Sequence, residues 1–253
     1  MFGIVRNRVD SSNDSPGIDK FLSELTGSVR LRARWCLTEE SAGTNDGGMS
    51  TTALIVIDVQ ESFRQRPNWS AVNHPDIADR VNRLVRASRD RDDLVVWVLH
   101  SEPGTGGVFD PAAGHVRLIE GLEPVDGEPI LTKTSHNAFT TTNLQQTLTQ
   151  QGIREVVISG IRTEQCCETT TRVASDLGYD VVFVTEATAT TPLPHWEAPL
   201  DRSLDEVLAD PRTLSPEVIV ERTEYALAGR FATIRTLDQA TAAPGSPWHG
   251  EAS

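Results

Sequence analysis

The stretch Ala-Leu-Ile-Val-Ile-Asp, at residues 53–58, is a short apolar run that ends in a carboxylate. A run of this length and composition is typical of a strand that is buried on both faces of a parallel sheet. Five similar runs follow it, at 94–100, 129–133, 155–160, 180–185 and 231–236. Helical patterns lie between the runs, at 73–91, 141–151, 164–177 and 215–229. The alternation predicts one doubly wound α/β domain, with a six-stranded, mostly parallel sheet and helices on both faces.

The composition agrees with this fold and excludes several classes of protein. The chain has 253 residues, of which 38% are hydrophobic, enough for one sizeable core. Its 23 basic and 36 acidic side chains give a net charge of −13, which repels phosphate backbones and argues against nucleic-acid binding. The apolar runs are far shorter than the roughly 18 residues of a membrane span, so we expect no membrane contact. Three cysteines, two of them adjacent, give no framework of disulfides, which favours the cytoplasm.

Residues 1–48 differ from the rest of the chain. They contain Asn-Asp-Ser-Pro-Gly and Ser-Ala-Gly-Thr-Asn-Asp-Gly-Gly, compositions that are typical of loops or disorder. Met49 stands just before the first predicted strand, so the leader is either a flexible arm or a translated upstream stretch. We expect the folded domain at 49–240 and a flexible tail at 241–253.

Three chemically active side chains lie at or after the ends of predicted strands. Asp58 ends the first strand, Lys133 ends the third, and Cys166 follows the fourth. Each alone has an ordinary explanation, as a turn cap, a solvated lysine or a structural cysteine. The carboxyl ends of parallel strands meet at one edge of a sheet, where the binding crevice forms. Together the three residues therefore predict a base, an electrostatic helper and a nucleophile in one site.

Lysine usage gives a second, weaker indication that Lys133 is a functional residue. Only Lys20 and Lys133 are lysines, so 21 of the 23 basic residues (23 − 2) are arginines. Coding bias accounts for the excess of arginine. A planar, forked guanidinium cannot replace a compact ammonium, however, and a lysine kept at position 133 is consistent with a need for the ammonium there.

The adjacent cysteines are predicted to differ in role. Thr163 is predicted as the N-cap of the next helix, which places Cys166 at the third helical position. Unpaired N–H groups and the helix dipole are expected to lower the pKa of a thiol at that position. Cys167 lies about 100° further round the helix and is expected to face the core.

Four stretches of the chain carry a family resemblance: Ala-Leu-Ile-Val-Ile-Asp-Val-Gln-Glu-Ser-Phe (53–63), Lys-Thr-Ser-His-Asn-Ala-Phe-Thr-Thr-Thr-Asn-Leu (133–144), Ser-Gly-Ile-Arg-Thr-Glu-Gln-Cys-Cys-Glu-Thr-Thr (159–170) and Gly-Tyr-Asp-Val-Val-Phe-Val-Thr-Glu-Ala-Thr-Ala (178–189). They resemble the isochorismatase-like cysteine hydrolase family, which includes nicotinamidases and carbamoylsarcosine amidases. The stretches occur in the family's order and extend the resemblance over about residues 52–237. The resemblance implies the doubly wound fold and a hydrolase of small molecules.

The resemblance also implies roles for individual residues. Asp58 would be the general base, Lys133 would hold the thiolate and the developing charge, and Cys166 would be the nucleophile. The family pattern Gly-x-x-Thr-x-x-Cys falls on Gly160, Thr163 and Cys166, which selects the first of the two cysteines.

An oxyanion hole follows from the same resemblance. Family members have a non-proline cis peptide before the nucleophile turn, which corresponds to Ile161–Arg162 here. That bond would place the backbone N–H of Arg162 beside that of Cys166, and the two would bind the oxyanion.

Two departures from the family narrow the predicted function. The nicotinamidase branch binds a divalent metal through an Asp-x-His pair and a second histidine, but residues 64–69 contain no such pair. We therefore expect no metal and no cofactor. Isochorismatases that cleave an enol ether often lack the cysteine, whereas this chain has it. These departures favour a metal-independent cysteine hydrolase that cleaves a C–N bond of a small amide or ureide through a thioester.

Two alternatives stay open. The first is vinyl-ether hydrolysis of the isochorismatase type, with Asp58 as the acid and no need for the cysteine. The second, and least favoured, is a non-catalytic binding protein on the same fold.

Residues for binding the substrate are predicted on loops next to the motifs: Phe63, Trp69, His136, Phe139 and Arg162. The aromatic rings would line an apolar pocket, and the guanidinium would suit an anionic group. His136 either contacts the substrate or holds its own loop. The segments 63–72, 101–128 and 186–214 are the expected specificity loops. The expected partner is a small-molecule substrate, and the resemblance implies a homodimer or a homotetramer.

Overall fold

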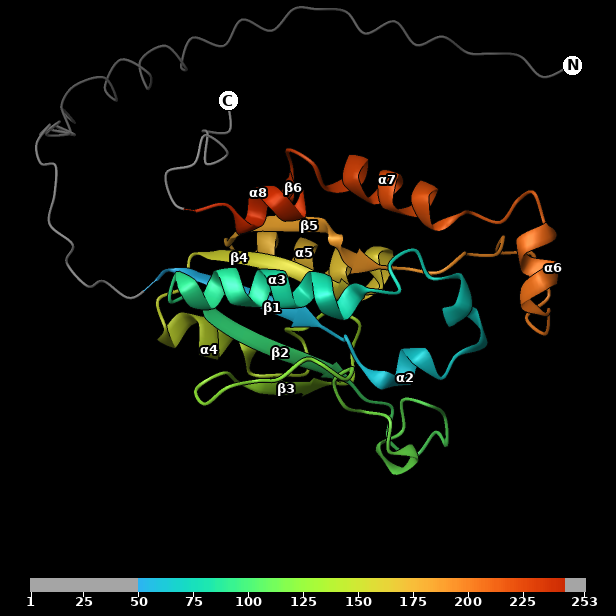
Figure 1. Ribbon diagram of the computed structural model, residues 1–253, viewed down its shortest axis with the longest axis horizontal. Helices are drawn as coiled ribbons and strands as arrows, with labels where there is room; N and C mark the ends of the chain where they lie inside the picture. Colours follow the sequence, from blue (N-terminus) through green and yellow to red (C-terminus); the bar gives the residue numbers. More distant parts are fainter. Residues whose placement is uncertain (1–49, 244–253) are drawn as a thin grey trace, which may run out of the picture. The chain divides into compact units, whose positions relative to one another are not determined.

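The computed structural model describes residues 50–243 and contains one six-stranded sheet. Its strands are β1 (Thr52–Ile57), β2 (Leu94–His100), β3 (Ile130–Lys133), β4 (Glu155–Ile161), β5 (Asp180–Ala189) and β6 (Thr233–Arg235). Their order is β3-β2-β1-β4-β5-β6, and all five pairings are parallel. The predicted fold is confirmed, and this sheet is parallel throughout (Figure 1).

Helices cover both faces of the sheet. They are α2 (Glu61–Arg64), α3 (Ile77–Asp90), α4 (Leu144–Gln150), α5 (Glu168–Asp176), α6 (Leu204–Ala209), α7 (Pro216–Leu227) and α8 (Leu237–Thr241), with short turns η1 (Pro67–Ala71), η2 (Pro111–Ala113) and η3 (Thr163–Cys167). Buried side chains of α3 and α8 pack against one face, and those of α4, α5 and α7 pack against the other. Within residues 50–243, no helix is both long and apolar enough to span a membrane.

Local sequence explains where the main helices form. In α3 the buried residues Ile77, Val81 and Leu84 recur every three or four positions, which gives the helix one apolar stripe. In α7 the Ser215 hydroxyl accepts a hydrogen bond from the N–H of Val218, and Pro216 occupies the first turn. Both patterns agree with the prediction from sequence.

Two short helices are not predicted from the sequence. The helix α6 lies within the predicted loop 186–214, and α8 ends one residue inside the predicted tail. Both begin with a capping box, from Ser203 to Glu206 in α6 and from Thr236 to Gln239 in α8. That motif is the signal that could have revealed them. The predicted leader and residues 244–253 lie outside the described residues.

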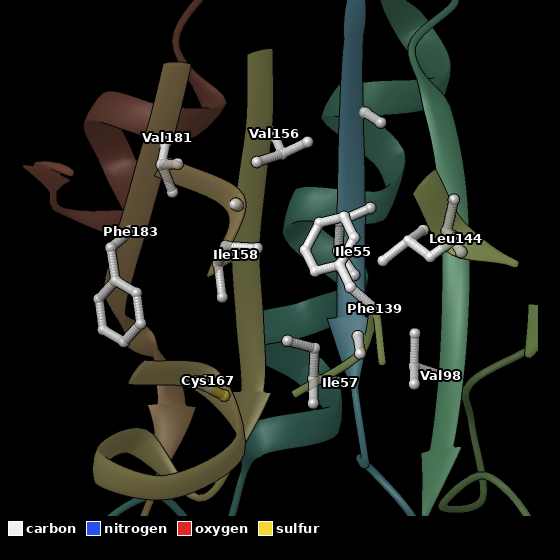
Figure 2. Close-up of a cluster of buried hydrophobic side chains, with 14 of the residues drawn as sticks. Ile55, Ile57, Val98, Phe139, Leu144, Val156, Ile158, Cys167, Val181 and Phe183 are labelled. Atoms are coloured by element: carbon white, nitrogen blue, oxygen red, sulfur yellow. The ribbon is translucent and has the colours of Figure 1, made fainter. Parts of the chain in front are cut away.

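The core has two parts because alternate strand residues point to opposite faces of the sheet. Ile55 and Ile57 join the cluster on the side of α4 and α5, which Figure 2 shows. Leu54 and Val56 join the cluster on the side of α3. Cys167 has no exposed surface and lies in the first cluster near the carboxyl ends of the strands, which confirms its predicted core position (Figure 2).

The crevice of a doubly wound sheet forms where the strand order reverses, which here is between β1 and β4. Gly160, near the end of β4, has a φ of +135°. A Cβ atom at this position would lie 2.0 Å from the carbonyl oxygen of Ile57 on β1. Only glycine permits this close approach, directly beside the position of Asp58.

We expect Gly160→Ala to lower the free energy of unfolding by about 3 kcal/mol or more, because the new methyl group overlaps the backbone of β1 and φ is unfavourable. Gly178→Ala is the matched control, since Gly178 has a φ of +89° but a methyl group added there would meet no atom within 4 Å. The control should lose only about 1–2 kcal/mol. Urea unfolding measures both values, and equal losses would contradict the close-approach explanation.

Candidate active site

Asp58 lies directly after β1, at the carboxyl edge of the sheet. Its side chain has no exposed surface, and its φ is +54°, in the left-handed region. That conformation costs a non-glycine residue about 1–2 kcal/mol and is typical of functional positions. The backbone N–H of Asp58 donates to the carbonyl of Val98 at 2.8 Å. The backbone that carries the Asp58 carboxylate is therefore held in a fixed, strained conformation at the end of β1.

Lys133 brings the three predicted residues together. It ends β3, two strands away from β1, and its side chain is fully buried. Its Nζ lies 2.8 Å from Oδ2 of Asp58 and 3.4 Å from Sγ of Cys166. Side chains from the ends of three strands thus meet around one ammonium group.

The ammonium has two further contacts. Its Nζ donates to the carbonyl of Ser135 at 3.0 Å and lies 3.3 Å from Nδ1 of His100. The contact with Asp58 is an ion pair, and the carboxyl also lies close enough to Cys166 for a side-chain hydrogen bond. The Asp58 carboxylate is therefore able to accept a proton from Cys166.

Cys166 lies in η3, a π-helical turn between β4 and α5. The Ile161–Arg162 peptide that precedes the turn is cis, as the family resemblance implies. The predicted N-cap is wrong, because Thr163 is itself the first residue of the turn. Its hydroxyl instead donates to Oγ1 of Thr188 on β5 at 2.8 Å, which ties the turn to the sheet.

The predicted lowering of the pKa of Cys166 is also wrong. Burial and the neighbouring Asp58 carboxylate raise the pKa of the thiol to about 12, and Lys133 offsets only part of the rise. Burial likewise raises the pKa of Asp58, against the lowering effect of Lys133, and so makes this carboxylate a stronger base. The Cys166 thiol is therefore protonated at neutral pH, and the contact with Lys133 favours the ionised form of the Asp58 carboxyl.

Moving the proton from Cys166 to Asp58 leaves the net charge of this cluster unchanged. Before and after the transfer, one negative group faces the Lys133 ammonium. Such a transfer avoids the large cost of an uncompensated charge in a buried site. The thiol can thus become a nucleophile during attack, with Asp58 as its base, although its own pKa is high.

The backbone around the cysteine suits the predicted oxyanion hole, which stays a prediction. Cys166 lies in the first turn of a helix, where N–H groups lack intrahelical acceptors. The carbonyl of Arg162 accepts two N–H groups of the turn, at 3.2 Å each, which fixes the turn. The Arg162 side chain is buried, with Nε 3.1 Å from Oε1 of Glu164 and Nη2 donating to the carbonyl of Thr191 at 2.8 Å. Its charge is therefore already balanced by a carboxylate.

The other predicted substrate contacts lie at different depths. Phe63 is half-buried and packs edge-on against Phe109, with ring centroids 4.9 Å apart. Trp69 is half-buried against the core cluster on the side of α3. His136 is exposed, whereas Phe139 is buried in the other cluster. Substrate binding by these residues stays a prediction.

His100 is a site residue that the sequence analysis missed. It ends β2, and its Nε2 lies 3.3 Å from Oε1 of Glu102, while its Nδ1 faces Lys133. Burial, followed by the charge of Lys133, lowers the pKa of His100, so the ring is neutral at neutral pH. The buried Gln60 side chain fixes its backbone, since it accepts from the His100 N–H at 2.7 Å and donates to its carbonyl at 3.0 Å. The position at a strand end, which singled out Asp58, was the available signal.

A doubly wound parallel sheet with a carboxylate, an ammonium and a thiol buried at its carboxyl edge defines an α/β protein with a cysteine-centred site. Residues 52–211 match the isochorismatase domain family. The chain therefore belongs to the isochorismatase family of hydrolases. Among residues 50–243, no group of three or more His, Cys, Asp or Glu side chains is placed to hold a metal ion.

Comparison with individual proteins agrees with the family. The chain is 29% identical over 187 residues to the uncharacterized isochorismatase family protein YrdC of Bacillus subtilis. The aligned residues cover 74% of this chain and 92% of YrdC. It is 36% identical over 146 residues to a streptothricin hydrolase of Streptomyces noursei, which covers 56% of each chain. The crystal structure of an isochorismatase from Pseudomonas putida KT2440 is similar with a TM-score of 0.63 and 28% identity, and covers 74% of this chain and 88% of that one.

We expect Asp58→Asn and Lys133→Gln to move the pKa of Cys166 in opposite directions. The first removes a negative charge that raises this pKa, so alkylation of Cys166 by iodoacetamide should begin at lower pH than in the wild type. The second removes the positive charge that lowers it, so alkylation should begin at higher pH. In the wild type, the rate of Cys166 alkylation should still increase with pH above about pH 9, where the alkylation rate of an ordinary thiol reaches its plateau.

Mass spectrometry locates the label, and the urea-unfolded protein is the control in which the same thiol has its ordinary pKa. Urea unfolding of each variant verifies that it is folded. Shifts of the same sign in both variants, or a wild-type rate that levels off below about pH 8, would contradict the electrostatic account of the site.

Proposed function

We propose that this protein is a metal-independent cysteine hydrolase that cleaves a C–N bond of a small amide, ureide or related substrate. The observation that carries the proposal is the contact of Lys133 Nζ with both Oδ2 of Asp58, at 2.8 Å, and Sγ of Cys166, at 3.4 Å. A base, a nucleophile and a fixed positive charge at these distances are the groups that acyl transfer requires. The similarity to a streptothricin hydrolase supports a hydrolytic reaction.

The depth of the site supports a small substrate. Asp58 and Lys133 have no exposed surface, and Cys166 is 7% exposed. A cavity of about 670 Å³ beside Ser50 and Asp93 lies at the amino ends of the strands, so it does not serve this site. Only a compact carbonyl group would reach the sulfur without rearrangement of the surrounding backbone.

In the first half of the reaction, Cys166 Sγ attacks the substrate carbonyl while its proton passes to Asp58. The C–S bond forms, and the π electrons of the carbonyl move to its oxygen. The backbone N–H groups of Arg162 and Cys166 would hold this oxyanion. Lys133 keeps its charge and offsets the negative charge that is transferred from one group to the next.

In the second half, the oxyanion collapses and the C–N bond breaks. The amine or ammonia leaves with the proton that Asp58 received. Asp58 then takes a proton from water, which attacks the thioester. The resulting oxyanion collapses, the C–S bond breaks, and Asp58 returns this proton to the sulfur as the acid product leaves.

We expect Cys166→Ala to lower turnover by at least about a thousandfold, because the proposed covalent intermediate forms on the Cys166 sulfur. Release of ammonia from a panel of small amides and ureides measures the effect. Cys167→Ala is the matched control, since this neighbouring thiol is buried in the core and should affect stability but not chemistry. Full activity of Cys166→Ala on the same substrate would contradict the proposal.

Vinyl-ether hydrolysis is the second candidate, because burial raises the pKa of Asp58 and thereby suits it to act as an acid. Pyruvate release from isochorismate that survives Cys166→Ala would favour this candidate. A binding protein without activity is the remaining alternative, which an inert Cys166 and the absence of turnover on both substrate classes would support. The cytoplasmic location and the dimer or tetramer stay predictions.

A further inference from the structure

Aromatic rings connect the three site residues to a second arginine, Arg66. The Phe109 ring packs edge-on against His100, with centroids 5.6 Å apart, and His100 contacts Lys133. Phe109 also packs edge-on against Phe63. The Arg66 guanidinium carbon lies 4.8 Å from the Phe109 centroid and 5.9 Å from the Phe63 centroid. The path of contacts from Arg66 to Lys133 therefore runs through the Phe109 and His100 rings.

The charge of Arg66 is uncompensated. Within residues 50–243, its side chain forms no ion pair and donates no hydrogen bond, and the residue is exposed. Two other arginines near it are paired, Arg64 with Glu61 and Arg162 with Glu164, each at 3.1 Å. Burial lowers the pKa of Arg162, and the positive charge of Arg66 adds to this lowering, which agrees with their closeness.

The stacked geometry leaves Arg66 ready to bind an anion. Contact with the rings uses the face of the guanidinium, whereas its N–H groups point outward in the plane and fit a carboxylate bidentately. The rings also shield one side of the charge from water, which strengthens such a pair. The backbone is fixed as well, since Arg66 caps η1 and its N–H donates to the carbonyl of Phe63 at 3.1 Å.

The surroundings of Arg66 have room for a ligand. Arg66 lines a hollow of about 290 Å³ together with Pro192 and Leu204. These residues belong to the segments that follow α2 and β5, which lie at the carboxyl side of the sheet (Figure 1). The hollow thus lies at the same edge of the sheet as the three site residues, and Arg66 is the residue that connects its lining to the rings beside them.

From these contacts we propose that Arg66 is a specificity residue that binds a carboxylate of the substrate, so the substrates are small amides or ureides that carry an acid group. The inference rests on the proposed function, because Arg66 would bind the carboxylate of the same substrate whose carbonyl carbon Cys166 attacks. Arg66, with its free N–H edge, takes the anion, and the paired Arg162 does not.

Two pairs of thiol reagents test this without a known substrate. Iodoacetate carries a carboxylate where iodoacetamide carries an amide, and the two reagents are otherwise the same. The second pair is 3-maleimidopropionate and its amide, in which a longer linker separates the acid or amide group from the reactive carbon. For each pair, the ratio of the alkylation rates at Cys166, acid over amide, is measured by mass spectrometry on the full chain. Arg66→Gln should lower this ratio at least about tenfold in one pair or both, because it removes a charge-assisted, bidentate contact.

Arg86→Gln is the matched control, since Arg86 is an exposed arginine on α3 with no ion pair among the described residues. It removes the same charge and should leave both ratios unchanged. If the ratios in Arg66→Gln and Arg86→Gln are equal while Cys166 still reacts, the role of Arg66 is overturned and the proposed nucleophile stands. If neither iodoacetate nor iodoacetamide labels Cys166 even in the alkaline range where its thiol ionises, the proposed function fails, and this inference fails with it.

Discussion

A buried ammonium needs a negative partner, and the site is arranged around this constraint. Lys133 has no exposed surface, and an isolated charge in such a place costs several kcal/mol. Asp58 supplies the compensating charge at 2.8 Å. Because one ammonium balances one negative group, the proposed reaction moves the proton of Cys166 to Asp58 instead of ionising the thiol independently. His100, the fourth member, is neutral because burial lowers its pKa and because a second positive charge would lie 3.3 Å from the first.

The order of the strands makes this arrangement possible. Asp58 and Cys166 follow the adjacent strands β1 and β4, on the two sides of the reversal in strand order, while Lys133 reaches toward them past the end of β2. The long, unbranched lysine stem suits that reach, and its compact head fits between a carboxylate and a sulfur, where a planar guanidinium would not. Gly160 brings the backbone of β4 close to β1 at the same point. The fold therefore determines the distances on which the proposed chemistry depends.

Much of this could be predicted from the sequence, because strand ends are local signals. Short apolar runs located all six strands, and their last residues revealed Asp58 and Lys133. The pKa of Cys166 could not be predicted in the same way, since helix position is local whereas burial and the Asp58 charge come from tertiary structure. Tertiary pairing also explains why Arg162, predicted to bind an anion, is already paired with Glu164. The motif revealed which residues meet, but not which of them holds the proton.

The location of that proton is open to direct measurement. The S–H stretching vibration absorbs in a region of the infrared spectrum that is free of other protein bands. A difference spectrum between the wild type and Cys166→Ala isolates the band of this one thiol. We expect the wild type to show the band at neutral pH and to lose it only in strongly alkaline solution, because burial and Asp58 raise the pKa of Cys166 to about 12. A wild type without this band at neutral pH would hold a preformed thiolate and would contradict the account.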